Sequence, residues 1–319
     1  MNNYFFKVLR SGINTTFQDK GRFHMQHFGV TPGGCMDVKS FLIANALVGN
    51  SLDEGVLEFA YQGPLLKLEK GKTKIAITGN VHFKIIKLNQ ESREGECNRT
   101  YYLDEGDQID ILATKESAYG YMSLEGGFNI EPFCKSVSVL SRAQIGPNNG
   151  NKIKINDKIN IKFISKNKKI YTTKVLRENK NVIRVLKGPQ HDYFSKESQK
   201  DFFSKEYKIS NLTDRMGMRL EGVSMKNIVD TNIRSEGITK GAIQVPADGQ
   251  PIILLTDYPT IGGYPKIANV ISADYDLLTQ KVPGEKISFK LIELHEAEQL
   301  YKEHLNSVSA IIKNIKETN

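Results

Sequence analysis

Glycine-rich segments that carry charged side chains occur at several points of this 319-residue sequence. The first is the run TTFQDKGR over residues 15–22, which is followed by His27. Asp19 and Arg22 are close enough in sequence to pair, and a carboxylate can orient a guanidinium towards an anionic ligand. A structural ion pair that pins a loop explains the same residues, so both interpretations stay open at this point.

Two arginines flank a glycine in the run DRMGMRL over residues 214–220. In a strand, Arg215 and Arg219 would share one face because they are four positions apart. Two such guanidinium groups could hold a carboxylate or a phosphate through paired hydrogen bonds. The alternative is that one of them forms an ion pair with Asp214 or Glu221.

A third run, TIGGYPK over residues 260–266, ends in a lysine. Gly262 and Gly263 permit a close backbone approach to a ligand, Lys266 supplies a cation, and Tyr264 supplies a hydroxyl or a stacking face. The pattern GxxxxGK[ST] of a phosphate-binding P-loop is absent. Four polar residues upstream of this run strengthen the prediction of a site: Gln244, Asp248, Gln250 and Asp257.

The elements that must position these residues read mostly as short strands. Apolar runs rich in Ile, Val and Phe, separated by Gly and Asp, are typical of strands. Residues 241–257 predict a hairpin, because two apolar runs surround Gly249, which can adopt positive φ. The predicted strands cover residues 74–79, 83–88, 108–112, 158–164, 182–188, 252–257, 268–274 and 286–294.

Few helices are predicted. Asp37 can cap a helix that begins at Val38, and Gly49 can end it in the left-handed conformation. Gly33 and Gly34 precede this helix, but the carboxylate of Asp37 would oppose an anion there, which favours a structural role. Apolar residues at three- and four-residue steps predict an amphipathic helix over residues 295–315.

These patterns predict a mainly β protein with two β-barrel domains, few helices and a C-terminal helix. The stretch SKNKKIYTTK is polar and basic and lacks a hydrophobic period, so it places a boundary near residues 165–180. We expect one domain over residues 1–165, a second over 180–295, and a helical tail over 296–319.

Composition restricts the function class. Hydrophobic residues make up 39% and charged residues 25% of the chain, an ordinary soluble composition. The N-terminus lacks the pattern of a signal peptide, and no apolar run reaches the ~18 residues of a membrane helix. We therefore expect a cytoplasmic protein with no membrane partner. The three cysteines and six histidines fit no metal-ligand spacing, so no metal site is predicted.

The net charge of +8 is concentrated in one segment. Residues 152–208 contain 16 Lys and Arg against 6 Asp and Glu, a local charge of 16 − 6 = +10. No recognition helix, RRM-like aromatic motif or zinc finger accompanies these lysines. A solvated lysine-rich face is the expected explanation, and no nucleic-acid partner is predicted.

Several long runs resemble one protein family, the allophanate hydrolase subunit 2 group. This group is also described as biotin-dependent carboxyltransferase-like and includes the C subunit of 5-oxoprolinase. The resemblance covers roughly residues 10–300, in family order, and implies two cyclophilin-like β-barrel domains. The matching runs are TTFQDKGR, MDVKSFLIANALVGN, LEFAYQGPLL, GPQHDYF, DRMGMRLEG, SEGITKGAIQVPADGQPIILLTD, IGGYPKIANVISAD and PGEKISF.

The resemblance implies a role as the C subunit of an ATP-dependent 5-oxoprolinase, acting with the A and B subunits to convert 5-oxo-L-proline to L-glutamate. The B subunit would be the direct partner, and ATP with Mg²⁺ would act at the level of the complex. In that reaction Lys266, Arg215 and Arg219 would hold phosphate or the substrate carboxylate. Asp248 or Asp257 would act as a base or bind Mg²⁺.

Two alternatives follow from the same resemblance. One is the carboxyltransferase component of a biotin-dependent urea or amide carboxylase, with biotin carried on another protein because the sequence has no biotin-attachment motif. The other is a regulatory protein that binds a kinase inhibitor similar to the B subunit. The sequence departs from the family pattern between about residues 124 and 160. It also reads Asp257-Tyr258-Pro259-Thr260 where the family has an arginine.

Overall fold

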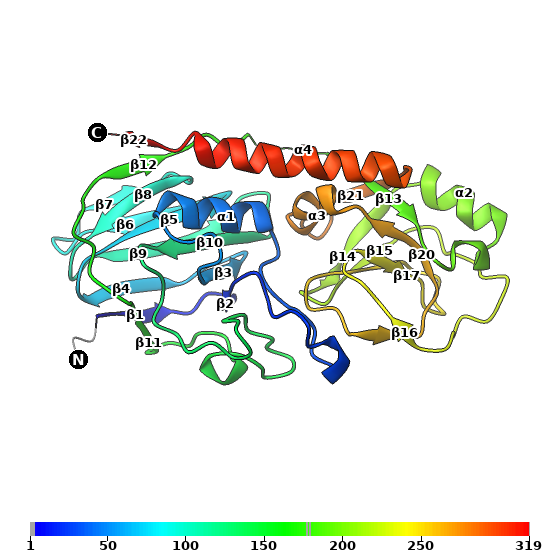
Figure 1. Cartoon of the computed structure of the whole chain (residues 1–319), viewed down its shortest axis with the longest axis horizontal. Coiled ribbons are helices and arrows are strands. Elements are labelled where there is room, and N and C mark those ends of the chain that lie inside the picture. Colours follow the sequence, from blue (N-terminus) through cyan, green and yellow to red (C-terminus); the bar gives the residue numbers. More distant parts are fainter. Residues whose placement is uncertain (1–3, 177, 179, 319) are drawn as a thin grey trace. The chain divides into compact units, whose positions relative to one another are not determined.

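The computed structural model describes residues 4–176, 178 and 180–318, and they form two compact units. The first unit comprises Met1–Arg22, Asp37–Leu176 and Ser307–Asn319, and the second comprises Phe23–Met36 and Arg177–Asn306. Compared with the expected domains, a short N-terminal segment belongs to the second unit, and the last residues of the chain belong to the first. Strands dominate both units, which confirms the prediction of a mainly β protein (Figure 1).

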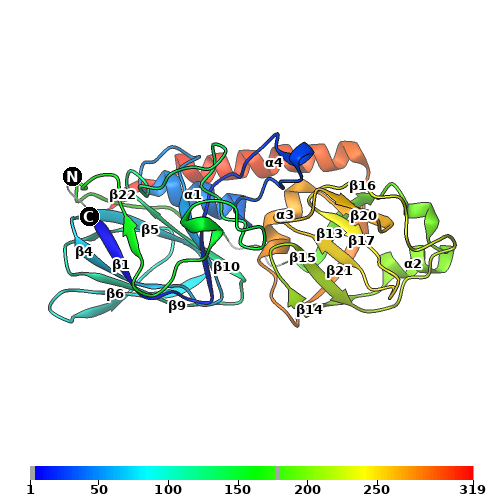
Figure 2. The ribbon, with the colours of Figure 1, turned by 90° about the horizontal axis from the view of Figure 1, so that it is seen from below.

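The strands of the first unit form two antiparallel sheets. The outer face of the six-stranded sheet is seen in Figure 2, where β1, β4, β6 and β9 are labelled. This sheet has the order β11 (Lys158–Asn160), β1 (Phe5–Arg10), β4 (Leu65–Lys70), β9 (Gln108–Thr114), β6 (Val81–Ile86) and β7 (Ser92–Glu94). The seven-stranded sheet has the order β2 (Asn14–Gln18), β3 (Val56–Ala60), β10 (Tyr119–Leu124), β5 (Thr73–Gly79), β8 (Arg99–Leu103), β12 (Ile170–Thr172) and β22 (Lys316–Thr318).

The core of the first unit is formed by alternate strand residues, as the period of two requires. Ile75 and Ile77 of β5 belong to one large buried cluster with Phe59 and Phe83. Ala76, between them, belongs to a second cluster with Leu47 of helix α1 (Val38–Leu47). Helix α1 therefore covers the outer face of the seven-stranded sheet.

The predicted start and end of α1 are confirmed. The Asp37 side chain accepts a hydrogen bond from the Ser40 amide at 2.9 Å and so caps the helix. Gly49 has φ +77° and its amide bonds to the Ala46 carbonyl. This is the left-handed end that a glycine favours.

The second unit is built on a closed barrel of seven strands. Neighbouring strands are antiparallel except for β13 and β21, which are parallel. A separate two-stranded sheet joins β16 (Glu236–Gly237) and β19 (Ile261–Gly262). The barrel order is β13 (Val182–Lys187), β20 (Lys266–Val270), β17 (Ala242–Gln244), β18 (Ile252–Leu254), β15 (Gly217–Glu221), β14 (Tyr207–Thr213) and β21 (Lys286–Leu291).

Helices α2 (Lys196–Ser204) and α3 (Ser272–Thr279) also belong to the second unit. Phe202 of α2 stacks on Phe289 of β21 with ring centroids 4.5 Å apart. Three single-turn helices complete the list: η1 (Gln26–Phe28), η2 (Asn148–Gly150) and η3 (His191–Tyr193).

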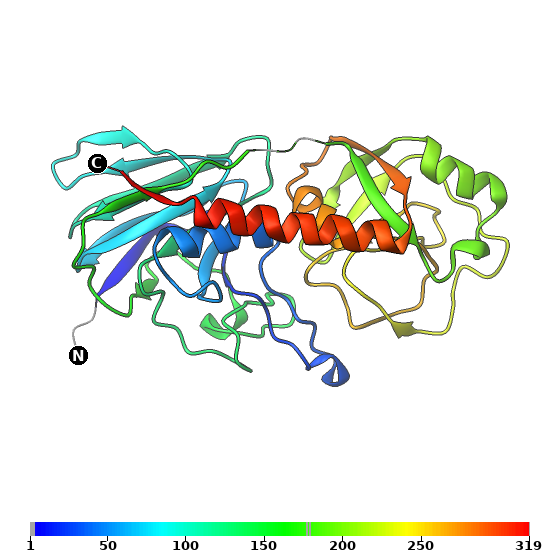
Figure 3. The same cartoon turned by 45° about the horizontal axis from the view of Figure 1, so that its top comes forward.

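Helix α4 (Leu294–Lys313) contributes to both units. Ala297 and Leu300 pack with Ile271 of the second unit. Ile311 and Ile312 pack with Leu47 of the first. Strand β22 follows α4 and lies alongside β12 (Figure 3).

The hairpin and the C-terminal helix are confirmed, but the expected helical tail over 296–319 also contains strand β22 (Lys316–Thr318). Two strand predictions and the predicted boundary need correction as well. Residues 271–274 do not continue β20, because α3 begins at Ser272. The predicted strand over 158–164 is limited to β11, which ends at Asn160. The polar boundary segment contains β12, which pairs with β8 and β22; residues 177 and 179 of that segment lie outside the described residues.

Candidate functional site

A buried lysine anchors a cluster of polar side chains in the second unit. The Lys266 side chain is only 4% exposed, and its ammonium lies 2.5 Å from Oε1 of Glu236. The Gln190 amide donates to the same oxygen at 2.8 Å. Lys266 also lies 3.4 Å from the Tyr264 carbonyl. One cation, one carboxylate and one amide are thus joined by direct hydrogen bonds, and these residues form the core of what we call the Lys266 cluster.

Gly188 explains how Gln190 reaches this cluster. Its amide bonds to the Ile267 carbonyl at 2.9 Å just beyond β13. A Cβ at Gly188 would lie 2.2 Å from the Lys266 carbonyl oxygen, so only glycine allows this approach. The backbone amide of Lys266 then donates to the Gln190 side chain at 3.2 Å.

Gln244 adds a second amide to the cluster, opposite Lys266 in the β17–β20 pairing. Among the described residues its buried Nε2 has no hydrogen-bond partner. A Cβ at Gly262 would lie 2.6 Å from that nitrogen. The glycine of the predicted Gly-Gly turn therefore makes room for this amide. A buried donor without an acceptor is costly, and an oxygen atom of a ligand or of water would satisfy it.

The charge state of the cluster follows from its contacts. Hydrogen bonds from Lys266 and then from Gln190 lower the pKa of Glu236 below its usual range. Glu236 is 43% exposed, whereas its lysine partner is buried. The carboxylate is therefore ionised at neutral pH, and it faces solvent.

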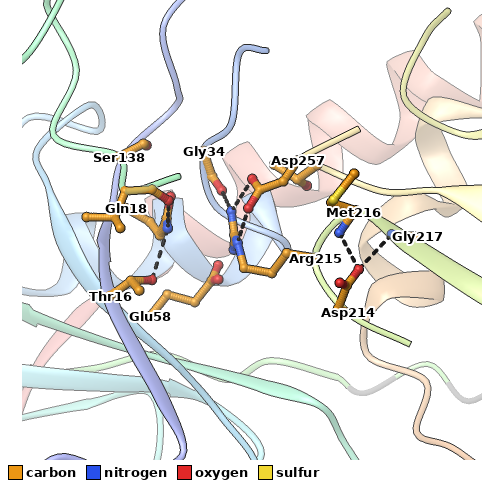
Figure 4. A network of polar contacts seen from close by, with 12 residues as sticks. Thr16, Gln18, Gly34, Glu58, Ser138, Asp214, Arg215, Met216, Gly217 and Asp257 are labelled. Atoms are coloured by element: carbon orange, nitrogen blue, oxygen red, sulfur yellow. Dashed lines mark hydrogen bonds and ion pairs between the residues drawn. The ribbon is translucent and has the colours of Figure 1, made fainter. Parts of the chain in front are cut away.

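Arg215 and Asp257 form a separate, closed ion pair. The Arg215 Nε and Nη2 each lie 2.9 Å from one oxygen of Asp257, and Nη2 also donates to the Gly34 carbonyl at 2.5 Å. Figure 4 shows the guanidinium between these two partners. Arg215 precedes β15, so the prediction that it shares a strand face with Arg219 is wrong. The Asp214 side chain bonds to the amides of Met216 and Gly217 and forms the turn between them.

Arg219 pairs with neither of the acidic residues expected for it. Its Nη1 lies 2.9 Å from Asp248, in a half-exposed pair. The Gln250 amide bonds to Asp248, and its side chain accepts from the Gly222 amide. From Arg219 on β15, the barrel register leads to Ile252 on β18, then to Gln244 on β17, and finally to Lys266 on β20. Three strand spacings, about 14 Å of backbone, therefore separate Arg219 from Lys266.

Asp19 and Arg22 lie in the first unit, where both form hydrogen bonds with the loop of residues 136–138. Asp19 accepts four hydrogen bonds of 2.6–2.7 Å, from the Gly21 and Val137 amides and from the Ser136 and Ser138 hydroxyls. The buried Arg22 donates to the Ser138 carbonyl. In the same unit, Gln18 bonds to Thr16 (Figure 4).

Two further predicted residues lie outside the cluster of polar side chains. His27 lies in η1, is exposed, and has its ring 4.0 Å from that of Phe28. The Gly263 carbonyl accepts a hydrogen bond from the Ile233 amide at 2.9 Å, so this glycine serves the backbone of a neighbouring loop.

The structure thus joins Lys266, Gln244, Gly262 and Tyr264 of the predicted residues and adds two that the sequence analysis did not select. Glu236 and Gln190 lie 30 and 76 positions from Lys266, so local spacing could not reveal them. Both lie in runs that carry the family resemblance, Glu236 in SEGITK and Gln190 in GPQHDYF. That resemblance is the one feature of the sequence that could have identified them.

The described residues hold neither a metal-binding cluster nor a membrane-spanning helix. No group of three or more His, Cys, Asp and Glu side chains is arranged to hold a metal ion there. In the same part of the chain, no helix has the length and apolar character needed to cross a bilayer.

Comparisons with known proteins place this geometry in context. The C subunit of the 5-oxoprolinase of Escherichia coli (strain K12) is 31% identical over 297 residues, 91% of this chain and 92% of its own. The protein of the same name from Haemophilus influenzae is 30% identical over 318 residues, 98% and 99% of the two chains. The crystal structure of the K. lactis urea amidolyase superposes with a TM-score of 0.88 at 26% identity, over 98% of this chain. This chain spans only 20% of that larger protein.

The sequence model of one family, described as the carboxyltransferase domain, subdomain A and B, matches residues 28–291. That range includes the whole barrel of the second unit and the Lys266 cluster. This chain belongs to the family of carboxyltransferase domains with subdomains A and B.

Proposed function

We propose that this chain is the C subunit of an ATP-dependent 5-oxoprolinase, which acts with the A and B subunits to convert 5-oxo-L-proline to L-glutamate. The observation that carries the proposal is the match to two bacterial 5-oxoprolinase C subunits over at least 91% of both chains. A relative of the same length argues for the same role in a complex, whereas a likeness to one-fifth of a larger enzyme argues only for a shared part.

The Lys266 cluster suits the chemistry of this reaction. A lactam amide is a poor electrophile, so phosphorylation of its oxygen creates a better leaving group. We propose that Lys266 holds the negative charge of the substrate carboxylate or of the phosphoryl group. The unfilled Nε2 donor of Gln244 would bind a carbonyl or carboxylate oxygen of the same ligand. Glu236 and Gln190 would position the ammonium.

Neither Asp257 nor Asp248 is proposed as the general base. Both oxygens of Asp257 accept hydrogen bonds from Arg215. Asp248 accepts from Arg219 and from the Gln250 amide. The oxygens of both carboxylates are therefore already occupied by hydrogen-bond donors of this chain. ATP with Mg²⁺ is proposed for the complex as a whole.

The decisive experiment reconstitutes the complex. This chain would be co-purified with candidate A and B subunits from the same organism, and glutamate and ADP would be measured from 5-oxo-L-proline and ATP. We expect release of both products only when all three proteins are present. Release without this chain, or no release from a complex that forms, would overturn the proposal.

A matched variant separates the site from the fold. Lys281 is as buried as Lys266 and is also paired with a glutamate, Glu285, at 2.9 Å. Lys266→Met should abolish product release, whereas Lys281→Met should reduce it only as far as it lowers the amount of folded protein. Equal activity of the two variants would remove Lys266 from the site.

A carboxyltransferase role is the second candidate, and the TM-score of 0.88 to urea amidolyase favours it. Carboxybiotin carried on another protein would supply the carboxyl group, and the donors of Lys266 and Gln244 would hold the carbonyl oxygen of urea or of another amide. The test is urea-dependent transfer of labelled carboxylate from carboxybiotin. Transfer without 5-oxoproline turnover would favour this role.

A further inference from the structure

A pocket of about 600 Å³ lies in the first unit, on the outer face of the seven-stranded sheet beside the end of α1. This volume is within the range of small-molecule sites. The polar lining includes Lys74, Glu125 and Asn50. The pocket belongs to other elements and another unit than the Lys266 cluster, so the inference does not depend on the proposed function.

Lys74 is the most deeply buried charged group of this pocket. Its side chain is 3% exposed, and its ammonium lies 3.8 Å from Oε2 of Glu125 and 5.4 Å from the centre of the Tyr171 ring. The first distance is too long for a hydrogen bond. Among the described residues, the Lys74 ammonium donates no hydrogen bond to a side chain or carbonyl. A buried cation with three unfilled donors thus lines the pocket.

Glu125 is held at this distance by contacts of its own. Its Oε2 accepts the hydroxyl of Ser165, and its amide donates to the Lys74 carbonyl at 2.8 Å. The Ser165 carbonyl in turn accepts from Tyr102 at 3.4 Å. The Ser165 hydroxyl thus engages Oε2, the carboxylate oxygen nearest to Lys74, and a ligand oxygen can accept the hydrogen bonds that Lys74 does not make to Glu125.

Part of the pocket wall is apolar. It includes Leu47 at the end of α1, Val48 directly after it, Phe163, Ile312 and Ile315. Such walls would bind a compact hydrocarbon or aromatic body, because its surface would leave water. Glu54 also lines the pocket, but its charge is engaged by Lys162 at 2.8 Å.

We propose that this pocket binds a small carboxylate with a compact apolar body, with Lys74 holding the carboxylate. The site favours an anionic ligand over a cationic one, because the buried ammonium of Lys74 lacks hydrogen-bond acceptors. The nearest anion, Glu125, is 22% exposed and already bonded. The partial negative charge at the C-terminal end of α1 and that of Glu125 limit the affinity, so we expect millimolar binding of simple probes.

The test uses three fluorinated probes and the full chain. 4-Fluorobenzoate, 4-fluorobenzamide and 4-fluorobenzylamine share a ring and differ in charge, and their ¹⁹F linewidths report binding. We expect saturable broadening of the benzoate alone. At least tenfold weaker binding is expected for Lys74→Met. The control Lys67→Met removes a half-exposed lysine of β4, paired with Glu69, and should bind as the parent does.

A second variant guards against a fold defect in Lys74→Met. Ala46 of α1 lines the pocket and is half-buried, so Ala46→Leu should fill the space while leaving the lysine in place. It should also weaken benzoate binding at least tenfold, with an unchanged melting temperature. Equal benzoate binding by the parent and both variants, preferential binding of the benzylamine, or no binding of any probe by the parent would overturn the proposal.

Discussion

The loop around Asp19 and the cluster around Glu236 are each built around a carboxylate, but only the first carboxylate is buried and fully hydrogen-bonded. Asp19 is buried, and its two oxygens accept four hydrogen bonds from its own loop and from residues 136–138. Glu236 is half-exposed and accepts two, from Lys266 and Gln190. Beside it, the Nε2 donor of Gln244 is unfilled among the described residues.

The difference separates polar residues that hold the fold from those that can hold a ligand. A carboxylate whose lone pairs are all used has nothing to offer a substrate, but its removal leaves several buried donors unsatisfied. A cluster with an unfilled donor and an exposed edge can bind new atoms at little structural cost. Polar, glycine-rich segments look alike in sequence, and only the hydrogen-bond inventory distinguishes them.

The largest expected effect is on stability, at Asp19. Asp19→Ala leaves four donors without their acceptor, and we expect a loss of about 4 kcal/mol in the free energy of unfolding. Urea denaturation of the full chain measures it. Asp53→Ala is the control, since Asp53 forms an exposed pair with Lys20 and should cost at most about 0.5 kcal/mol. Equal losses would remove the distinction drawn above.

The next largest effect is on turnover, at Lys266. Lys266→Met should lower glutamate release by the three-protein complex at least about 100-fold, equivalent to about 2.7 kcal/mol of barrier. Its melting temperature should fall no further than that of Lys281→Met. If instead stability falls as it does in Asp19→Ala and turnover per folded molecule is unchanged, Lys266 is a structural residue.

A smaller effect is expected in the pH dependence of stability, at Glu236. Its pKa in the folded state is lowered by Lys266 and Gln190. The ionised Glu236 carboxylate therefore adds to the free energy of unfolding above its unfolded pKa of about 4.3. This contribution is lost as the pH falls through the lower pKa of the folded state. Because solvent screens this exposed carboxylate, Glu236→Gln should cost under about 1 kcal/mol at pH 7. The difference from the parent should shrink in melts as the pH falls below the unfolded pKa; a constant difference would exclude the ion pair as its cause.

The smallest effect is expected at Arg219. Its pair with Asp248 is half-exposed on both sides, and such pairs contribute about 0–1 kcal/mol. Arg219→Ala should change the free energy of unfolding by at most about 0.5 kcal/mol and should leave turnover within about twofold. A loss of turnover like that of Lys266→Met would place Arg219 with the ligand-binding residues after all.

Much of the fold could be predicted because its determinants are local. The cap at Asp37, the glycine that ends α1, and the turn at Gly249 each act within a few residues, and the structure confirms all three. Helix α3 was missed for the opposite reason. The apolar run of β20 continues through Ile271 into the helix, and the N-cap has no side-chain hydrogen bond to signal the change.

The candidate site could be predicted only in part. Lys266 and Gly262 stand in one run, and their glycine-rich setting drew attention to them. Their partner Gln190 follows β13, which pairs with β20 in the barrel, and their partner Glu236 lies in β16, which pairs with β19. The roles of Asp19 and Arg215 were equally hidden, because four of their partners, Ser136, Ser138, Gly34 and Asp257, lie far away in sequence.

The pairing of β22 with β12 also has a consequence for biosynthesis. The barrel of the second unit has all its strands once residue 291 has been made. The seven-stranded sheet of the first unit lacks its edge strand until Lys316–Thr318 emerge, and Ile311, Ile312 and Ile315 join its second cluster equally late. The part of the chain that leaves the ribosome first is thus the part that is completed last.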